Sequence, residues 1–305
     1  MRDATREAAA VQLSVVIAAY DAEPYLAAAL ESVLREAPAD AEIIVVDDGS
    51  RDATGDIARR HGERVKLLHN DVPTGPGRAR NAGARVASGD VLAFHDADDL
   101  VLPGRFALLQ AVLEARPEID LVFANGARCD AGGRRLGPVI GARQARRLLR
   151  RCDLEEMLRG GVVYPQGMSI RRARFLALGG FVAERGEDWD FALRAALRLR
   201  MAYVDREVFA YRQNPASVTS RRREFGETLV RVLERFVAAH PEAAAVVGAA
   251  RLDAARASQL ARVARLRLAD GDRAGATAAW DAAVALVPMR LRYRWRCALA
   301  RYAGR

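Results

Sequence analysis

Lysine is almost absent from this 305-residue chain, cysteine is scarce, and no long hydrophobic run occurs. Lys66 is the single lysine, so nearly every basic side chain is an arginine. The three cysteines (Cys129, Cys152 and Cys297) are widely spaced and form no CxxC pair, which argues against a disulfide framework and a zinc site. No stretch of about 18 apolar residues is available to span a bilayer. The polar start, Met1 to Glu7, does not resemble a signal peptide, so we expect a cytoplasmic protein.

The net charge of +9 is concentrated at one end of the chain. Residues 221–305 contain 17 arginines and 8 acidic residues, which leaves residues 1–220 close to neutral. An enzyme that binds nucleic acid would more often place its basic charge around its site. We therefore expect no nucleic-acid partner.

Apolar, β-branched runs alternate with helical periodicity over the first 124 residues. This alternation predicts βαβ units and an α/β fold with a mostly parallel sheet. Strands are expected at 13–20, 42–46, 65–69, 90–95 and 119–124, and helices at 24–36, 52–60, 78–87 and 103–115. Polar clusters follow three of these strands, at 18–21, 47–50 and 96–99. Ligands bind beyond the carboxyl ends of such strands, so these clusters are expected to form one site.

The character of the sequence changes at about residue 222. No strand pattern is evident from there on, and helices rich in alanine, leucine, valine and arginine dominate. We therefore predict a catalytic α/β domain over residues 1–220 and a basic helical extension over residues 221–305. Residues 258–286 faintly resemble one tetratricopeptide-type hairpin, but one copy does not establish a repeat.

Three carboxylates lie within four positions in the motif FHDADDL, residues 94–100. Asp96, Asp98 and Asp99 repel one another at the end of an apolar strand, which raises their pKa values. A divalent cation relieves this repulsion, and oxygen ligands suit Mg²⁺ or Mn²⁺. The motif predicts either such a metal site or an acidic turn.

Two further motifs carry candidate ligand contacts. EIIVVDDGSRDAT, residues 42–54, places Asp48 where it could bind a base or ribose, while Asp52 suits a helix cap. GPGRARNAG, residues 75–83, brings Arg80 to a helix start, where it could neutralise a diphosphate. Ordinary strand–turn–helix packing is the alternative for both motifs.

The motif GEDWDFALRAALR, residues 186–198, opens a predicted amphipathic helix with acidic residues. Glu187, Asp188 and Asp190 would be favourable there through the helix dipole alone. The functional alternative makes Asp188 a general base for an acceptor hydroxyl, with Trp189 offering a flat face to a sugar ring.

These motifs occur in a fixed order that resembles the family 2 glycosyltransferases of the GT-A fold. The resemblance covers roughly residues 13–220 and rests on an ordered set: SVVIAAYDAEPYL, EIIVVDDGSRDAT, GRARNAG, SGDVLAFHDADD, GGF and GEDWDFALR. It implies inverting, metal-assisted transfer of one sugar from a UDP-, GDP- or TDP-linked donor. The implied cofactor is Mn²⁺ or Mg²⁺, and the implied acceptor is a glycan or a lipid-linked sugar in bacterial cell-surface glycan synthesis.

The resemblance also implies a role for each matching residue. The implied contacts to the donor nucleotide and sugar come from Ala18, Tyr20, Asp48, Arg80, Asp96 and Asp98. Asp98 and Asp99 are the implied metal ligands. In the Glu187–Asp188 pair, Asp188 matches the catalytic base, while Gly180, in the Gly179–Phe181 turn, and Trp189 match the acceptor side.

Two departures qualify the resemblance. Many relatives carry a histidine near residues 211–217, where this chain has Gln213 and Asn214, so that metal or diphosphate contact is not expected. The QxxRW motif of processive synthases is absent, which favours transfer of a single sugar.

Three alternatives stay open on the sequence. A sugar-nucleotide pyrophosphorylase would show a basic, glycine-rich loop where this chain has AAYDAEPYL. A non-catalytic sugar-nucleotide-binding protein is the second alternative, and all the acids expected for activity are present. The arginine-rich terminal segment, residues 289–305, fits an ordinary packed helix with a solvated basic face, and peripheral contact with an anionic membrane surface is the alternative.

Overall fold

The computed structural model describes residues 11–130, 132–160, 163–213 and 222–302. The chain divides into two compact units, which interleave along the sequence. The first comprises Met1–Gly141, Tyr164–Ala183 and Leu199–Arg212, and the second comprises Ala142–Val163, Glu184–Arg198 and Gln213–Arg305. The domain boundary that we expect at residue 220 stays a prediction.

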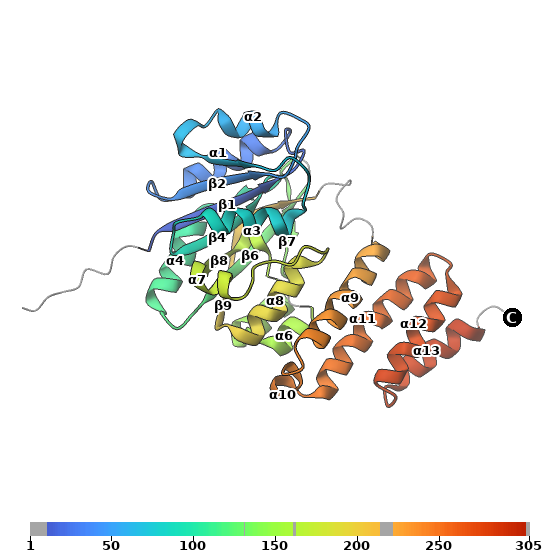
Figure 1. Cartoon of the computed structure of the whole chain (residues 1–305). Coiled ribbons are helices and arrows are strands. Elements are labelled where there is room, and N and C mark those ends of the chain that lie inside the picture. The colour runs from blue at the N-terminus through green and yellow to red at the C-terminus, as the bar shows by residue number, and fades with distance from the viewer. Residues whose placement is uncertain (1–10, 131, 161–162, 214–221, 303–305) are drawn as a thin grey trace, which may run out of the picture. The chain divides into compact units, whose positions relative to one another are not determined.

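A nine-stranded sheet forms the centre of the first unit (Figure 1). Its strand order is β3-β2-β1-β4-β8-β6-β9-β5, with β7 paired to β6. The strands are β1 (Leu13–Ala19), β2 (Glu42–Asp47), β3 (Lys66–His69), β4 (Val91–Asp96), β5 (Leu100–Val101), β6 (Leu121–Cys129), β7 (Arg135–Pro138), β8 (Met168–Arg171) and β9 (Met201–Arg212). The expected α/β class is therefore confirmed.

The four strands β3, β2, β1 and β4 run parallel to one another. Their carboxyl ends consequently meet at one edge, which is the edge that carries the three polar clusters. Strand β8 runs antiparallel to both β4 and β6, while β6 and β9 are parallel. The sequence pattern did not reveal β8, which has four residues, or β9, in which Asp205, Arg206 and Glu207 interrupt the apolar run.

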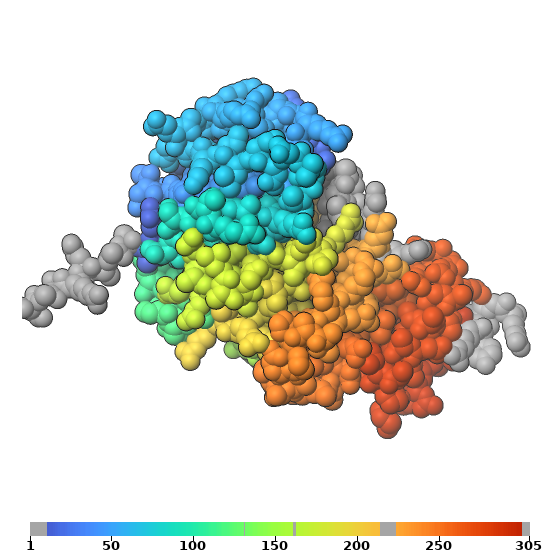
Figure 2. Space-filling view, viewed as in Figure 1, coloured from blue at the N-terminus to red at the C-terminus, as the bar shows by residue number. Residues whose placement is uncertain are grey.

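Helices cover both faces of this sheet. Apolar side chains of β1, β2 and β4 share one core with α1 (Leu26–Glu36) and α4 (Arg105–Ala115). Helix α3 (Pro76–Val86) packs on β1 and β2, and a Cβ added to its Gly83 would lie only 2.4 Å from Val16. Glycine thus permits close approach of helix and sheet. Figure 2 shows the side chains of this helical layer covering the strands.

Two short helices complete the first unit: α2 (Thr54–Arg59) and α7 (Arg172–Ala177). Helix α2 follows the polar cluster at the end of β2. Helix α7 brings Phe175 against Phe94 of β4, with ring centroids 5.0 Å apart. The Gly179–Gly180 turn follows α7, and both glycines have positive φ angles (84° and 67°).

The second unit is helical throughout its described residues. Its helices are α5 (Ala142–Arg150), α6 (Leu154–Leu158), α8 (Glu187–Arg198), α9 (Arg222–Ala239), α10 (Ala243–Val247), α11 (Ala249–Ala269), α12 (Arg273–Leu286) and α13 (Leu291–Tyr302). The expected change to helices after residue 222 is confirmed. Residues 130–160 contain β7, α5 and α6, and Ala145 and Leu148 give arginine-rich α5 a buried side.

Helices α11, α12 and α13 share a core of small and aromatic side chains. Trp280 of α12 is fully buried, and its ring lies 5.5 Å from that of Tyr293 in α13. Small residues such as Ala257, Ala261 and Ala283 let these helices approach closely. None of the helices in the described ranges is long and apolar enough to cross a membrane.

Candidate functional site

The ends of β1, β2 and β4 bring the first candidate residues together. Ala18 lies beside Val46 of β2 and beside Asp96 of β4 in the strand register. Ala18 is partly exposed, and Tyr20, just beyond the strand, is 51% exposed. Both residues are therefore accessible at the edge where the sequence placed a ligand.

Hydrogen bonds hold the loop after β1 against the loop after β2. Three successive backbone N–H groups of the loop after β1 donate to side chains of the DGSRDAT motif. Two backbone N–H groups of the loop after β2 donate to side chains of the loop after β1. The pairs are Asp21 N–Ser50 Oγ (3.0 Å), Ala22 N–Thr54 Oγ1 (2.8 Å), Glu23 N–Asp52 Oδ2 (3.0 Å), Arg51 N–Asp21 Oδ1 (2.9 Å) and Ala53 N–Glu23 Oε2 (3.1 Å). Asp52 also accepts from the N–H of Thr54, the first residue of α2. Ser50 and Asp52 thus have a structural role in this edge.

Asp48 is buried and organises the loop that precedes α3. Its carboxylate accepts hydrogen bonds from the side chains of Asn70 (2.7 Å) and Thr74 (2.7 Å). It also accepts from the backbone N–H groups of Thr74 and Gly75. Burial alone would raise the pKa of Asp48, but these hydrogen bonds outweigh burial and hold the pKa below its usual value. Asp48 is therefore an ionised, fixed group at the end of β2.

Arg80 and Asp96 form an ion pair at the end of β4. Arg80 Nη2 donates to Asp96 Oδ1 at 2.6 Å, and the arginine side chain is only 7% exposed. Its guanidinium also lies over the ring of Phe181, 5.5 Å from the centroid. The positive charge of Arg80 is thereby fixed beside the acidic cluster, as the loop-to-helix motif suggested.

Asn81, which the motif analysis did not single out, joins α3 to the Gly–Gly–Phe turn. Its side chain donates to the carbonyl of Phe181 (2.7 Å) and accepts from the N–H of Phe181 (2.9 Å). A Cβ on Gly180 would lie 2.3 Å from Asn81 Oδ1, and the φ of Gly180 is +67°. Glycine is therefore required there for two reasons. The sequence signal available for this residue was its place in the motif GRARNAG.

The two remaining acids of the FHDADDL motif differ in their surroundings. Asp98 is partly exposed, and burial together with the charge of Asp96 raises its pKa to about 6. Asp99 is 1% exposed, and burial followed by the charges of Asp96 and Asp98 raises its pKa well above the usual value. The predicted mutual repulsion of the cluster is therefore present.

Asp99 is held from both sides. Gln166 donates to its Oδ2 at 2.8 Å, and the backbone N–H of Arg212 donates to its Oδ1 at 2.8 Å. These bonds connect the end of β4 to β9 and to the η2 turn (Pro165–Gly167). Gln166 could not be found by motif, because it lies 67 residues further along the chain.

A buried basic pair lies directly behind the cluster. Arg105 donates to His95 Nδ1 (3.0 Å) and to the carbonyl of Phe94 (2.5 Å). Arg105 and His95 are both 0% exposed. Burial, followed by the charge of Arg105, lowers the pKa of His95 to about 3, so His95 is neutral. Its Nε2 lies 3.2 Å from the carbonyl oxygen of Asp99. Arg105 is consequently a countercharge to the acids from within the core.

The donor set can be compared with what a divalent cation needs. Among the described residues, no three His, Cys, Asp or Glu side chains are grouped to hold a metal by themselves. Asp96 shares one oxygen with Arg80, and both oxygens of Asp99 accept protein hydrogen bonds. Mg²⁺ typically binds one or two carboxylates together with substrate phosphates. The raised pKa of Asp98 and the repulsion behind it fit a cation of this kind.

The acidic pair predicted for catalysis lies in the second unit. Glu187 and Asp188 open α8, and the N–H of Trp189 donates to Asp188 Oδ1 at 2.7 Å. The expected acceptor contact of Trp189 is wrong for this structure. Its ring is 2% exposed and its indole N–H donates to the carbonyl of Met157 (3.0 Å), so the ring packs within the helical unit.

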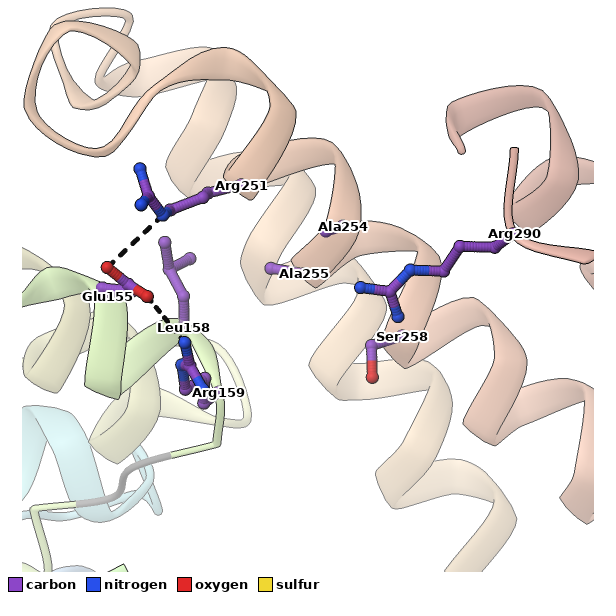
Figure 3. Close-up of a pocket in the computed structure, with 8 residues that line it drawn as sticks. All are labelled: Glu155, Leu158, Arg159, Arg251, Ala254, Ala255, Ser258 and Arg290. Carbon is purple, nitrogen blue, oxygen red and sulfur yellow. Dashed lines mark hydrogen bonds and ion pairs between the residues drawn. The ribbon is translucent and has the colours of Figure 1, made fainter. Parts of the chain in front are cut away.

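Each unit also contains a cavity of its own. In the first, a cavity of about 480 Å³ is lined by Asn70, Thr74, Arg78, Asn81, Ala82, Arg85, Phe181 and Ala183. In the second, a cavity of about 330 Å³ is lined by Glu155, Leu158, Arg159, Arg251, Ala254, Ala255, Ser258 and Arg290 (Figure 3). Of these two cavities, the one in the first unit is lined by residues that hydrogen-bond to Asp48 (Asn70 and Thr74) and to Phe181 (Asn81).

Asn214, one of the two residues that stand where many relatives have histidine, lies outside the described residues, while Gln213 is exposed.

Comparisons with known proteins give a family and several relatives. Residues 14–177, more than half of the chain, match the sequence profile of Glycosyl transferase family 2. The chain is 29% identical over 221 residues to Uncharacterized glycosyltransferase EpsJ of Bacillus subtilis (strain 168), a match that covers 68% of this chain and 62% of that protein. It is 30% identical over 220 residues to Putative glycosyltransferase EpsH of the same organism, covering 68% and 63%. The chain thus spans about three fifths of the length of these relatives.

A shorter match and a solved structure add to these findings. Over 114 residues the chain is 32% identical to the Escherichia coli UDP-Glc:alpha-D-GlcNAc-diphosphoundecaprenol beta-1,3-glucosyltransferase WfgD, covering 37% of this chain and 45% of that protein. The crystal structure of S. aureus TarS 1-349 in complex with UDP-GlcNAc is similar with a TM-score of 0.68 and 20% identity, covering 95% of this chain and 87% of that chain. The expected GT-A fold is therefore confirmed.

Proposed function

We propose that this chain, which belongs to glycosyl transferase family 2, transfers a single sugar from a UDP-sugar to an acceptor hydroxyl with inversion at the anomeric carbon. The observation that carries the proposal is the set of charged groups fixed at the ends of β2 and β4. Asp48, Arg80, Asp96 and Asp98 lie in the motifs of the family's sequence and at the edge where parallel sheets bind ligands.

The donor nucleotide occupies the edge next to β1 and β2 in this proposal. Ala18 and Tyr20 line the base and ribose, and Asp48 contacts the base or holds the loop that does so. The ionised state of Asp48 and its bonds to Thr74 and Gly75 support a preorganised contact of this kind. The names of WfgD and of the TarS complex both contain a UDP-sugar, which supports UDP over GDP or TDP.

The diphosphate lies beside Arg80 and the acidic cluster. Asp98, with the second oxygen of Asp96, is the pair suited to hold Mn²⁺ or Mg²⁺. Such a cation, when bound, stabilises negative charge on the departing diphosphate. Asp99 acts as a positioning residue, because Gln166 and the Arg212 backbone already occupy its oxygens. The proposed metal ligands are therefore Asp96 and Asp98, whereas the resemblance implied Asp98 and Asp99.

Asp188 is the proposed general base, with Glu187 beside it in the pair that matches the family motif. The acceptor oxygen attacks the anomeric carbon while its proton passes to the Asp188 carboxylate. The bond from the anomeric carbon to the diphosphate oxygen breaks, and its electron pair leaves with UDP. A single displacement of this kind inverts the anomeric centre, and a positioned base typically contributes about 10²–10⁴-fold to the rate.

The acceptor side is assigned to the turn around Gly180. Phe181 and Asn81 line the cavity of about 480 Å³ next to this turn, which supports the assignment. An acceptor sugar linked to a lipid diphosphate is the acceptor in the name of WfgD. We extend that chemistry to this chain, in the synthesis of a bacterial cell-surface polysaccharide or glycolipid.

A donor screen tests the activity. Thermal stabilisation and slow hydrolysis are measured with UDP-, GDP- and TDP-sugars in the presence of Mn²⁺, with EDTA as the matched control. We expect stabilisation by one or more UDP-sugars that requires the metal. Absence of any response across the panel would contradict the proposal.

Replacing Asp188 separates an enzyme from a protein that only binds the donor. Asp188→Asn should lower the turnover number by about 10²–10⁴-fold, because the general base is lost, and leave the dissociation constant for UDP within about twofold. Isothermal titration and a transfer assay measure both quantities. Glu184→Gln, an exposed acid four residues earlier, is the control and should change neither.

A further inference from the structure

Helix α13 presents an apolar stripe outward instead of inward. Leu291, Trp295 and Leu299 follow one another at intervals of four residues, so they lie on one face of the helix. They are 72%, 64% and 44% exposed. We call these three residues the α13 outer face. Met289, just before the helix, is 89% exposed and extends the apolar surface.

The opposite face of α13 already has its packing partners. Tyr293, Cys297 and Ala300 are 3%, 5% and 8% exposed and belong to the core shared with α11 and α12. Cys297 Sγ lies 3.0 Å from Asp281 Oδ1. The apolar residues of the outer face therefore do not serve the packing of this helix onto its neighbours.

Arginines border the outer face on both sides. At 3.6 residues per turn, Arg292 and Arg296 lie on one side of the stripe and Arg294 on the other, and Arg290 directly precedes the helix. All four are exposed, and no acidic residue occurs between residues 289 and 305. Within the ranges that the structure describes, none of these four arginines forms an ion pair with an acid.

Each border opens onto a cavity that holds further arginines. Arg296 and Leu299 line a cavity of about 270 Å³ together with Arg265, Arg273 and Leu268. Arg290 lines the cavity of about 330 Å³ in which Figure 3 shows Arg159 and Arg251 sharing one acid, Glu155.

Positive charges crowd one another at the first of these borders. Burial and then the charge of Arg296 lower the pKa of Arg265, and Arg262 and Arg292 act in the same direction. Like charges brought together in this way are unfavourable unless an anion accompanies them. The surface therefore combines an apolar stripe with an excess of positive charge.

We propose that the α13 outer face docks on a bilayer containing anionic phospholipids. Leu291, Trp295 and Leu299 enter the boundary between headgroups and acyl chains, and the bordering arginines bind headgroup phosphates. Nucleic acid would be served by the arginines alone and gives no role to an exposed leucine–tryptophan stripe. A second copy packed face to face would set four arginines against four arginines.

Vesicle binding of the full chain tests this proposal without donor or acceptor, so its outcome does not depend on the proposed transferase activity. Cosedimentation is measured with phosphatidylcholine vesicles and with vesicles containing about 30% phosphatidylglycerol. We expect binding only to the anionic vesicles, weakened by salt because each arginine near the surface contributes roughly fivefold to the partition coefficient.

Tryptophan fluorescence reports insertion at a single position. Of the three tryptophans, Trp189 and Trp280 are 2% and 1% exposed, so acrylamide reaches Trp295 far more readily. Anionic vesicles should shift the emission to shorter wavelength and protect it from acrylamide. Trp295→Phe should remove both changes while the remaining emission stays insensitive to vesicles.

Two variants and one control separate the contributions. The triple variant Leu291→Ser, Trp295→Ser and Leu299→Ser, and a variant with Arg290, Arg292, Arg294 and Arg296 changed to glutamine, should each bind anionic vesicles at least tenfold more weakly. The control changes three exposed apolar residues elsewhere (Leu149, Leu176 and Val246) to serine and should bind as the unmodified chain does.

Two outcomes would overturn the proposal. One is equal sedimentation of the unmodified chain and the triple variant with anionic vesicles. The other is a lipid-free dimer, seen by light scattering, that the triple variant loses, because it would assign the outer face to a second copy.

Discussion

The ends of β2 and β4 and the outer face of α13 use charge in opposite ways. At the strand ends and directly behind them, Asp48, Asp99 and Arg105 are 3% exposed or less, and each has hydrogen-bond partners from the protein. Along α13, Arg292, Arg294 and Arg296 are exposed, border apolar side chains and have no acid beside them in the described ranges. The first arrangement fixes the charged groups in position, and the second leaves the arginine side chains exposed to solvent.

This difference follows from what each region is proposed to do. Transfer chemistry needs dipoles and charges whose positions are set before the donor arrives, and burial together with hydrogen bonds from the protein provides this. Docking on a fluid surface needs no fixed geometry, so exposed guanidinium groups on long side chains suffice. Buried charge should therefore be costly to remove and exposed charge should not.

Replacing Arg105 should have the largest effect on stability. Arg105→Met keeps the side-chain length but leaves the Phe94 carbonyl and His95 without their donor and removes the countercharge behind the acids. Breaking one side of a buried charged arrangement costs about 3–5 kcal/mol. Urea unfolding followed by circular dichroism measures the loss in the free energy of unfolding.

Arg116→Met is the matched control for Arg105. Arg116 follows the same helix, α4, at its other end, and its side chain is 54% exposed. Its replacement should cost less than about 1 kcal/mol. Equal losses in the free energy of unfolding for the two variants would contradict the distinction between buried and exposed charge. If Arg105→Met does not fold, Arg105→Lys keeps the charge and should still unfold at lower urea than the unmodified chain.

Replacing Asp98 should have the second-largest effect on stability, and the sign of this effect depends on pH. Its folded pKa of about 6 lies above the unfolded value of 3.8, so protonated Asp98 favours the folded state. That stability is present below about pH 4 and is lost as the pH rises through 6. The loss amounts to at most about 3 kcal/mol. Asp98→Asn should therefore be more stable than the unmodified chain at pH 7.5 and no more stable at pH 4.

Unfolding in EDTA at the two pH values measures this effect, with Asp71→Asn, an exposed acid in the loop after β3, as the control. Addition of Mn²⁺ and UDP should stabilise the unmodified chain and leave Asp98→Asn unchanged, which tests the proposed metal contact separately. A variant that is less stable at both pH values would show that Asp98 has a structural role like that of Asp99.

The sequence was sufficient to predict the strand ends, because apolar β-branched runs and the acids that follow them are local patterns. The first four strands and the helices between them lie within a few residues of their expected positions. The hydrogen bonds that distinguish Asp98 from Asp99 were not predictable. They come from Gln166 and Arg212, which lie 67 and 113 residues away from Asp99.

Trp189 illustrates a second limit of the sequence. A tryptophan beside an acidic pair fits a sugar-binding face, yet helical periodicity cannot tell which side of α8 is covered by α6. For α13, the same uncertainty concealed the outer face. Arginine and aromatic residues alternate there, and only the burial of Tyr293 and the exposure of Trp295 separate the two sides.

The smallest effect on the free energy of unfolding is expected for replacements in the α13 outer face. Leu291→Ser, Trp295→Ser and Leu299→Ser remove apolar area that is already in contact with water, so the free energy of unfolding should fall by no more than about 0.5 kcal/mol per residue. Tyr293→Ser, on the opposite face of the same helix, should cost about 3 kcal/mol or more, because it leaves a cavity against Trp280. Thermal unfolding of the two variants compares the faces directly. A large loss for the outer-face variant would mean that these side chains support the fold, and the contrast between fixed and available groups would then fail at α13.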